Sequence, residues 1–325
     1  MAGGPEMENM ERLEGKSVLV TGGAGFIGGH VVELLLKINC KVIVVDIQKP
    51  GITYFFLRKL EEKVDYRCID ITHQNSVLSL FSDVHPDYII HLAALPIVEE
   101  AYETPRKAFQ VNIMGTVNIL EACRKSKNIK GIIIASSDKA YGKAKDTYTE
   151  DSPLKGDHPY DVSKSCEDLI AQTYYATYGL PIVITRFGNV YGEGDMHFDR
   201  IVPGICKAAA IGETLLVRSD GSYIRDYIYV KDVAHGYIFL LEKIQGIEGE
   251  AFNFSSLDHM KVLEVIRKAE VVLKKKINYK ILNNAHNEIP FQHLDDTKIK
   301  KLGWRNNYFF ESTIGSIVEW YRKIL

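Results

Sequence analysis

The sequence has few cysteines, almost no net charge and no long apolar segment. Its five cysteines are scattered without CxxC or metal-site spacing, so we expect free thiols, a cytoplasmic location and no bound metal. The 40 basic and 42 acidic residues nearly cancel, which argues against binding to nucleic acid or to an anionic membrane surface. No apolar run approaches the roughly 20 residues that cross a bilayer. The polar start predicts neither a signal peptide nor an anchor, so we expect a soluble globular protein.

Short apolar runs alternate with longer amphipathic segments over the first half of the chain. The runs are rich in Val, Ile and Leu and predict strands, whereas the segments between them predict helices. This β-α-β order predicts an α/β fold with a doubly wound parallel sheet of the Rossmann type. Pro159 and Gly179 mark the two ends of one helix. The expected strands are 17–22, 41–46, 64–70, 87–94, 129–137 and 180–189, and the expected helices include 26–37, 105–126 and 158–178.

The alternation loosens after about residue 190, which predicts a smaller α+β domain for substrate binding. Short strands are expected at 215–217 and 226–229, with helices near 198–210, 231–243, 260–274 and 310–324. The expected organisation is a flexible tail over 1–14, a Rossmann domain over 15–188, and mainly the second domain over 189–325, with about 226–250 returning to the first.

A glycine-rich turn directly follows the first expected strand and opens the first expected helix. It reads Thr21-Gly22-Gly23-Ala24-Gly25-Phe26-Ile27-Gly28. A dinucleotide pyrophosphate needs a tight turn, an unobstructed backbone and helix N-terminal N–H groups that point at it. The three glycines at 22, 25 and 28 supply these conditions, and Phe26 and Ile27 begin the helix. The motif predicts a dinucleotide site, with an ordinary strand-to-helix turn as the alternative.

Carboxylates end the next two expected strands. Asp46 would accept hydrogen bonds from the adenosine ribose and repel a 2′-phosphate, which favours NAD over NADP. Asp70 and Ile71 end the third strand, where a side chain and the backbone would meet the adenine. Each position has a plainer alternative, which is a turn former at Asp46 and a helix cap at Asp70.

Tyr160 and Lys164 stand four residues apart at the start of an expected helix and so share one face. A phenol is a poor base at neutral pH, but a nearby ammonium and the positive ring of oxidised nicotinamide favour its ionised form. Tyr160 would then take a hydroxyl proton while hydride leaves the same carbon. Ser136 and Ser137 end the fifth expected strand, and Ser137 would hydrogen-bond the reacting oxygen. The alternative is a surface helix pair without chemistry.

Together these motifs resemble the extended short-chain dehydrogenase/reductases, that is, the NAD-dependent nucleotide-sugar epimerases and dehydratases. The resemblance covers nearly the whole chain from about residue 15. It implies NAD as a tightly bound cofactor, a nucleotide-diphosphate sugar as substrate, and a homodimer formed through 105–126 and 158–178. The matching segments are TGGAGFIG, Asp46, His91-Leu92-Ala93-Ala94, Asn112, SSDKAYG (136–142), Tyr160 with Lys164, RFGNVYG (186–192) and RDYIYVKDV (225–233).

The resemblance also implies roles for single residues. Ser137, Tyr160 and Lys164 match the catalytic triad, in which Lys164 also contacts the nicotinamide ribose. Asn189 and Arg225 match positions that hold the substrate diphosphate, and a guanidinium fits phosphate oxygens in a bidentate way. For Arg225, an ion pair bridging the two domains is the alternative. The residues expected to line the cofactor are His91, Leu92, Ala93, Ala94, Asn112 and Ser136.

The two residues that directly follow Ser137 differ between the enzymes of this family that catalyse different reactions. The 4-epimerases typically place small unionised residues there, whereas the 4,6-dehydratases carry an acid–base pair. Asp138-Lys139 resembles the CDP-glucose 4,6-dehydratase variant, in which Asp138 would protonate the leaving hydroxyl and Lys139 would assist at C5. Segment 218–230 departs from those enzymes, which leaves the nucleotide base open. The predicted activity is therefore a nucleotide-sugar 4,6-dehydratase. The alternatives are a 4-epimerase, with Asp138 and Lys139 as a loop salt bridge, and a non-catalytic dinucleotide sensor.

Overall fold

The computed structural model describes residues 12–143, 146–284 and 289–325. The chain divides into two compact units. Unit 1 comprises Met1–Gly142, Pro153–Arg186 and Ala234–Phe252, and unit 2 comprises Lys143–Ser152, Phe187–Val233 and Asn253–Leu325. The expected tail over 1–14 falls mostly on residues 1–11, which lie outside the described residues. Leu13 is fully buried in unit 1, so residues just before the first strand already pack against the fold.

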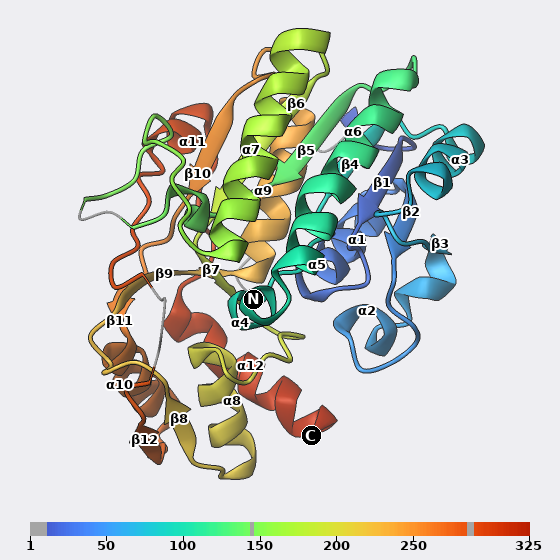
Figure 1. Cartoon of the computed structure of the whole chain (residues 1–325). Coiled ribbons are helices and arrows are strands. Elements are labelled where there is room, and N and C mark those ends of the chain that lie inside the picture. Colours follow the sequence, from blue (N-terminus) through green and yellow to red (C-terminus); the bar gives the residue numbers. More distant parts are fainter. Residues whose placement is uncertain (1–11, 144–145, 285–288) are drawn as a thin grey trace. The chain divides into compact units, whose positions relative to one another are not determined.

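A seven-stranded sheet in the order β10-β6-β5-β4-β1-β2-β3 forms the centre of unit 1 (Figure 1). The pairings β1–β2, β1–β4, β2–β3, β4–β5 and β5–β6 are all parallel. This arrangement confirms the predicted doubly wound α/β fold, and the strand order reverses between β1 and β4, which is where such sheets bind ligands. The strands are β1 (Ser17–Thr21), β2 (Lys41–Asp46), β3 (Asp65–Cys68), β4 (Tyr88–His91), β5 (Gly131–Ala135), β6 (Ile182–Phe187) and β10 (Ala251–Phe254).

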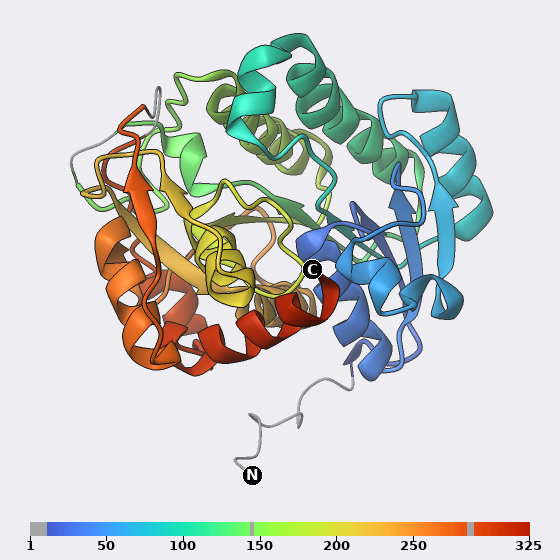
Figure 2. The same cartoon turned by 90° about the horizontal axis from the view of Figure 1, so that it is seen from below.

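Helices cover both faces of this sheet (Figures 1 and 2), with α3, α6 and α7 on one face and α1 and α9 on the other. Alternate strand residues, such as Ile132 with Ile134 and Ile182 with Ile184, pack under α3, α6 and α7 in one apolar cluster, because successive strand side chains point to opposite faces. The helices are α1 (Phe26–Lys37), α2 (Tyr54–Leu57), α3 (Gln74–Val84), α4 (Val98–Glu103), α5 (Pro105–Phe109), α6 (Thr116–Lys125), α7 (Pro159–Tyr178) and α9 (Val230–Glu242).

Two helix predictions have different outcomes. Helix α7 begins at Pro159 and ends at Gly179 with φ +66°, as expected. The single helix expected over 105–126 is interrupted by a π-helical segment, Gln110–Gly115, between α5 and α6. The side chain of Ile71 packs directly against Gly115, where an added Cβ would lie 2.5 Å from Ile71 Cδ1. The π-helical turn lies where the helix packs closely on Ile71, and the helical periodicity of the sequence does not reveal such an interruption.

Unit 2 contains two small sheets and helices. A three-stranded sheet has the order β11-β9-β7, and a two-stranded sheet pairs β12 with β8. The expected strand at 226–229 is longer in the structure, and β11 and β12 were not expected. No helix among the described residues is long and apolar enough to cross a membrane. The elements are β7 (Asn189–Tyr191), α8 (Ile201–Ile211), β8 (Leu215–Val217), β9 (Ile224–Tyr229), β11 (His259–Lys261), α10 (Val262–Leu273), β12 (Tyr279–Ile281), α11 (Thr297–Leu302) and α12 (Phe310–Ile324).

Candidate active site

The glycine turn at the end of β1 packs closely against neighbouring backbone. Gly22 has φ +69°, and a Cβ there would lie 2.7 Å from Ala93 N. At Gly28 a Cβ would collide with the Gly22 carbonyl, which lets α1 pack tightly behind the turn. Helix α1 begins at Phe26 with Gly25 as its N-cap, so its first N–H groups face the turn. This is a backbone cradle of the kind that binds a pyrophosphate.

The carboxylate of Asp46 holds that turn in place. Its Oδ2 accepts a hydrogen bond from Ala24 N at 3.0 Å, and its Oδ1 accepts one from Gln48 N at 3.0 Å. Burial raises the pKa of Asp46, and hydrogen bonds from the backbone oppose the shift. Each carboxylate oxygen can accept a further hydrogen bond. Asp46 thus stabilises the turn through its backbone hydrogen bonds and can also accept hydrogen bonds from ribose hydroxyls.

Replacing Asp46 by asparagine is expected to weaken NAD binding about ten- to a hundredfold, because one amide oxygen cannot satisfy both backbone donors and a ribose. Calorimetric titration with NAD measures this change. Asp65→Asn, at a half-exposed position on neighbouring β3, is the matched control. An unchanged Kd in Asp46→Asn would show that the carboxylate only shapes the turn.

Asp70 and Ile71 are engaged within unit 1. Asp70 Oδ1 accepts a hydrogen bond from Thr72 N at 2.8 Å, so the turn-capping alternative describes this side chain. The Ile71 side chain lies in the apolar cluster, and its carbonyl accepts a hydrogen bond from Asn118 Nδ2 at 2.8 Å. The structure thus gives both residues a structural role, and their contact with adenine stays a prediction.

His91 forms a buried bridge. Its Nδ1 lies 2.7 Å from Thr21 Oγ1, and its Nε2 lies 2.9 Å from Thr116 Oγ1. Burial, assisted by the positive charge of Lys164, lowers the pKa of His91 to about 3, so the ring is neutral. The Thr116 hydroxyl also contacts Asn112 O at 2.7 Å, so the bridge links β4 to α6 and to the turn before it. His91 is thus a structural link between β1, β4 and α6, and its place beside the cofactor stays a prediction.

Two further cofactor contacts are expected, at 92–94 and at Asn112. Leu92 and Ala93 lie against Gly22, and Ala93 N donates to Thr21 Oγ1 at 3.3 Å. Both residues therefore border the glycine turn, and the contact of 92–94 with the cofactor stays a prediction. Asn112 is buried; its Oδ1 accepts from Leu95 N at 2.7 Å, and its Nδ2 donates to Ser163 Oγ at 2.8 Å. It therefore braces the loop that carries Ala94 against α7.

Ser137, Asp138 and Lys139 follow β5 in a short 3-10 turn. Ser137 Oγ donates to Asp138 Oδ1 at 3.0 Å and accepts from Lys139 N at 3.2 Å. Lys139 Nζ lies 3.6 Å from Asp138 Oδ1. The Asp138 side chain is 3% exposed and that of Lys139 is 21% exposed. Asp138 and Lys139 are thus in ionic contact, with the carboxylate beside the serine hydroxyl; their role as an acid–base pair stays a prediction.

Tyr160 lies beside this turn. Burial raises the pKa of Tyr160 above its ordinary value; negative charges on Glu167, Asp138 and Asp161 raise it further, and a hydrogen bond with Ser137 opposes the rise. Tyr160 and Ser137 are therefore brought together as expected. The Lys164 ammonium is paired with a carboxylate, so its effect on Tyr160 is opposed by a nearby negative charge.

The compensating group is Glu167, which the sequence analysis missed. Lys164 Nζ donates to Glu167 Oε2 at 2.6 Å and to Ala135 O at 2.8 Å. The two side chains are 5% and 1% exposed. A spacing of three residues on a helix permits such a pair, but only the burial of both side chains distinguishes it from a surface pair.

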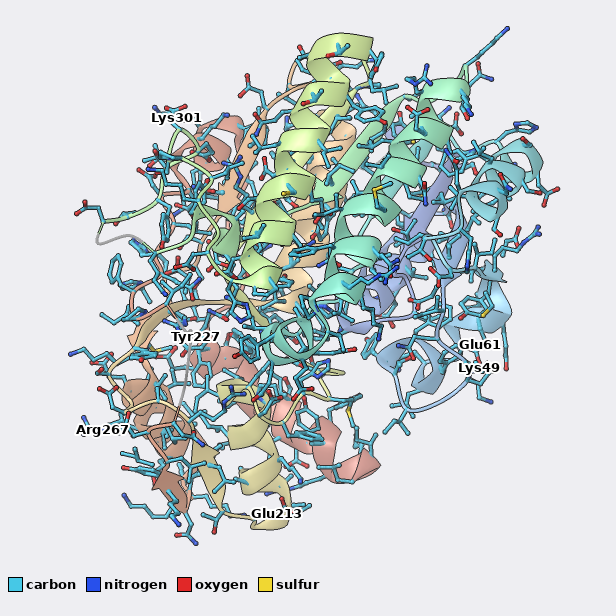
Figure 3. All side chains as sticks on the ribbon, in the orientation of Figure 1. Lys49, Glu61, Glu213, Tyr227, Arg267 and Lys301 are labelled. Carbon is cyan, nitrogen blue, oxygen red and sulfur yellow. The ribbon has the colours of Figure 1, made fainter. Side chains whose placement is uncertain are left out.

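Asn189 and Arg225 belong to unit 2 and lie on one face of its three-stranded sheet. Asn189 on β7 is paired with Tyr227 on β9, which is labelled in Figure 3. Arg225 stands two residues from Tyr227 on the same strand, so its side chain shares the face of Asn189. Asn189 Nδ2 is buried and, among the described residues, has no hydrogen-bond partner. A buried donor of this kind suits an anionic ligand.

Unit 2 also contains a cluster that the sequence did not predict. His259 Nδ1 and His293 Nδ1 lie 3.0 and 2.9 Å from Asp226 Oδ1, and Oδ2 accepts from Ser255 Oγ and Leu294 N, each at 2.8 Å. The three ligand-type groups lie close enough to share a metal ion. Four hydrogen bonds nevertheless satisfy the carboxylate by themselves, so the cluster ties β9 to β11 and to the 293–294 segment.

The residues of unit 1 fit a dinucleotide. At Gly22 and Gly28 a side chain would collide with neighbouring backbone. Asp46 can accept a further hydrogen bond, and Ser136 Oγ is a buried hydroxyl without a hydrogen-bond partner in the described part of the chain. Lys164 has three N–H donors, of which the described contacts use two. The glycine turn would hold the pyrophosphate, and Asp46 would hold the adenosine ribose. Lys164 would hold the nicotinamide ribose, with Ser136 beside it.

Comparison with known proteins identifies the family of the chain. The model of the NAD dependent epimerase/dehydratase family matches residues 18–255. The chain is 32% identical to a probable dTDP-glucose 4,6-dehydratase of Sinorhizobium fredii, with 94% of this chain and 92% of that protein covered. It is 29% identical to the CDP-glucose 4,6-dehydratase of Salmonella typhimurium, with 95% and 91% covered.

A third relative is a trifunctional enzyme of Arabidopsis thaliana with a UDP-glucose 4,6-dehydratase activity in its name. The identity is 29%, and the match covers 94% of this chain but only 47% of that enzyme. The chain therefore spans about half the length of this plant relative and over nine-tenths of the two bacterial ones.

Solved structures of two activities share the fold. A UDP-glucose 4-epimerase of Thermotoga maritima with UDP-glucose superposes with a TM-score of 0.85 at 28% identity, covering 95% of this chain and 99% of that chain. A dTDP-glucose 4,6-dehydratase of Streptomyces venezuelae with NAD bound gives 0.85 at 26% identity, covering 94% and 97%. The fold alone thus does not separate epimerase from dehydratase.

Proposed function

Because the chain belongs to the NAD-dependent epimerase/dehydratase family, whose members are enzymes acting on sugar nucleotides, we propose that it is a nucleotide-sugar 4,6-dehydratase. The observation that carries this proposal is the buried Asp138, hydrogen-bonded to Ser137 and next to Lys139. An epimerase needs no acid at that position. A dehydratase needs one group to protonate the leaving C6 hydroxyl and another to take the C5 proton.

The residues of unit 1 divide the proton transfers between them. NAD, when bound, accepts hydride from C4 of the sugar and later returns it to C6. Tyr160 takes the proton of the C4 hydroxyl, and Ser137 hydrogen-bonds the same oxygen. Asp138, when protonated, gives its proton to the leaving C6 hydroxyl. Lys139, when uncharged, takes the proton from C5, which is acidic beside the C4 ketone, and C5 regains a proton from Lys139 or from water when hydride reaches C6.

Each unit has its own part in this proposal. Unit 1 binds NAD through the glycine cradle and Asp46. Unit 2 binds the nucleotide diphosphate through Arg225 and Asn189, whose shared sheet face and unsatisfied amide suit phosphate oxygens. Two copies associate through the helical segments 105–125 and 159–178, where Met114 and Leu169 are each 50% exposed.

The alternative activity, a 4-epimerase, is favoured by one observation. Lys139 Nζ and Asp138 Oδ1 are 3.6 Å apart, which is also the geometry of an ordinary salt bridge. In that case Tyr160 and Ser137 complete the reaction together with a keto sugar that turns over in the site, and Asp138 and Lys139 only shape the loop.

Mass spectrometry distinguishes the two activities. The enzyme is incubated with UDP-, CDP-, GDP- and dTDP-sugars in deuterated water. We expect one of these sugars to lose a water and to gain deuterium at C5. An isomer of unchanged mass would reject the dehydratase in favour of the epimerase, and the productive nucleotide would identify the base.

A further inference from the structure

The proposed mechanism does not use the buried ion pair between Lys164 and Glu167. We propose that Glu167 is a positioning residue: its carboxylate fixes the Lys164 ammonium and opposes the loss of a proton from Tyr160. Hydride transfer therefore becomes fast only when this carboxylate is neutralised or the pH is high. The inference rests on the proposed roles of Tyr160 and Lys164.

The geometry gives Lys164 one dominant partner. Its Nζ lies 2.6 Å from Glu167 Oε2, and both side chains are almost completely buried. The only other described acceptor is the uncharged carbonyl of Ala135. An opposite charge at this distance in a poorly solvated environment offsets part of the field that Lys164 exerts on its surroundings. The ammonium therefore favours the Tyr160 phenolate less while Glu167 is ionised.

The neighbouring carboxylate does not share this role. Asp168 accepts hydrogen bonds from Arg186 Nε at 2.8 Å and Nη2 at 2.9 Å. This bidentate pair is typical of a structural ion pair, and an arginine stays charged. Adjacent carboxylates on α7 thus have separate partners, and only Glu167 is paired to a cation of the catalytic triad.

The groups around Glu167 come from several elements of unit 1. Helix α7 contributes Lys164, Asp168 and Tyr160, α6 contributes Thr116, and α9 contributes Tyr237. His91 from β4 joins through Thr116 and is neutral. Burial raises the pKa of Glu167 to about 7, opposed first by Lys164 and then by Thr116, with Asp168 adding to the rise. Near neutral pH the carboxyl group therefore changes between its two forms.

The sign of the effect follows from these charges. Below about pH 7 Glu167 is protonated, Lys164 keeps an uncompensated charge, and ionisation of Tyr160 becomes easier. Above that pH, the ionised Glu167 makes the same ionisation harder. Among the carboxylates that raise the pKa of Tyr160, Glu167 has the largest effect. Glu167→Gln removes this charge at all pH values and keeps the size of the side chain.

The test is the pH profile of NAD reduction in a single turnover. We expect the rising limb of Glu167→Gln to lie at least about one pH unit lower than that of the wild type. This is about a tenfold faster reduction at a pH that is below both limbs but above about 7, where wild-type Glu167 is ionised. Glu167→Asp, which keeps the charge, should retain the wild-type limb. Glu121→Gln, on the neighbouring helix α6 and paired with Arg124, is the matched control. Equal limbs in Glu167→Gln and the wild type would overturn the inference.

A second readout does not depend on turnover. The ¹³C resonance of the Glu167 carboxyl group, assigned by its loss in Glu167→Gln, should titrate near pH 7 and at a higher pH in Lys164→Met. A resonance that titrates in the ordinary glutamate range, or that ignores the Lys164 change, would reject the ion-pair half of the inference. If no sugar nucleotide reduces NAD bound to the wild type, the proposed function fails, while this titration still decides whether Glu167 and Lys164 are coupled.

Discussion

Replacing Tyr160 by phenylalanine is expected to lower turnover about a hundred- to ten-thousandfold, the usual contribution of a positioned acid–base group, while NAD stays bound. The phenol oxygen is the only atom removed, and it lies at the Ser137 hydroxyl beside the Asp138 carboxylate. Without it, no group at this position takes the C4 hydroxyl proton, so hydride cannot leave. Single-turnover reduction of bound NAD measures the loss directly.

Tyr174→Phe provides the matched control for this variant. Tyr174 lies on the same helix, and its hydroxyl donates to Glu121 at 2.9 Å, so the control removes an identical atom from α7 outside the site. It should keep full activity. Unaltered turnover in Tyr160→Phe would disprove the assigned role. Loss of bound NAD together with activity would indicate that Tyr160 maintains the site rather than reacts in it.

Replacing Asp138 by asparagine is expected to slow water loss by a similar factor while bound NAD still becomes reduced. An amide cannot protonate the leaving hydroxyl, but it still fills the buried position and can accept the hydrogen bond from Ser137. The 4-keto sugar should therefore accumulate with reduced NAD on the enzyme. Absorbance of the reduced cofactor and mass spectrometry of the sugar follow the two steps separately.

This variant also separates the two candidate activities. In an epimerase Asp138→Asn would leave the formation of an isomer nearly intact, because the carboxylate would serve only the loop. If NAD reduction itself vanished, Asp138 would belong to the hydride step or to the stability of the turn after β5. Asp151→Asn, at an exposed position, controls for the loss of one negative charge.

Much of the fold was predictable because period and spacing are local properties. Continuous apolar runs identified all of the first six strands of the main sheet, and Pro159 with Gly179 bounded α7 correctly. The strand ends were placed too wide, for example at 87–94 where β4 ends at His91. Strand length depends on where the neighbouring strand offers a partner, and β10 joins the edge from a segment far along the chain.

Site residues were predictable where the required chemistry is local. The glycine turn, Asp46, Tyr160 with Lys164, and Asp138-Lys139 each occupy one short segment, so their spacing already expresses the geometry that the ligand needs. His91 and Asn112 were matched to cofactor positions by resemblance, yet their polar atoms are bonded to Thr21, Thr116, Leu95 and Ser163. Those partners lie far along the chain, and no local pattern could name them.

The order of residues alone determined the doubly wound sheet, the dinucleotide cradle and the family of the enzyme. Only the tertiary structure decided the electrostatic state of the triad. A lysine four residues from a tyrosine can favour the ionised form of the phenol, but the size of this effect depends on the other charged groups buried beside the two side chains. Glu167 and Lys164 are in ionic contact on a face of α7 that is buried in the fold. In such a poorly solvated place the carboxylate of Glu167, which is the nearest charge, affects Lys164 more strongly than Tyr160 does.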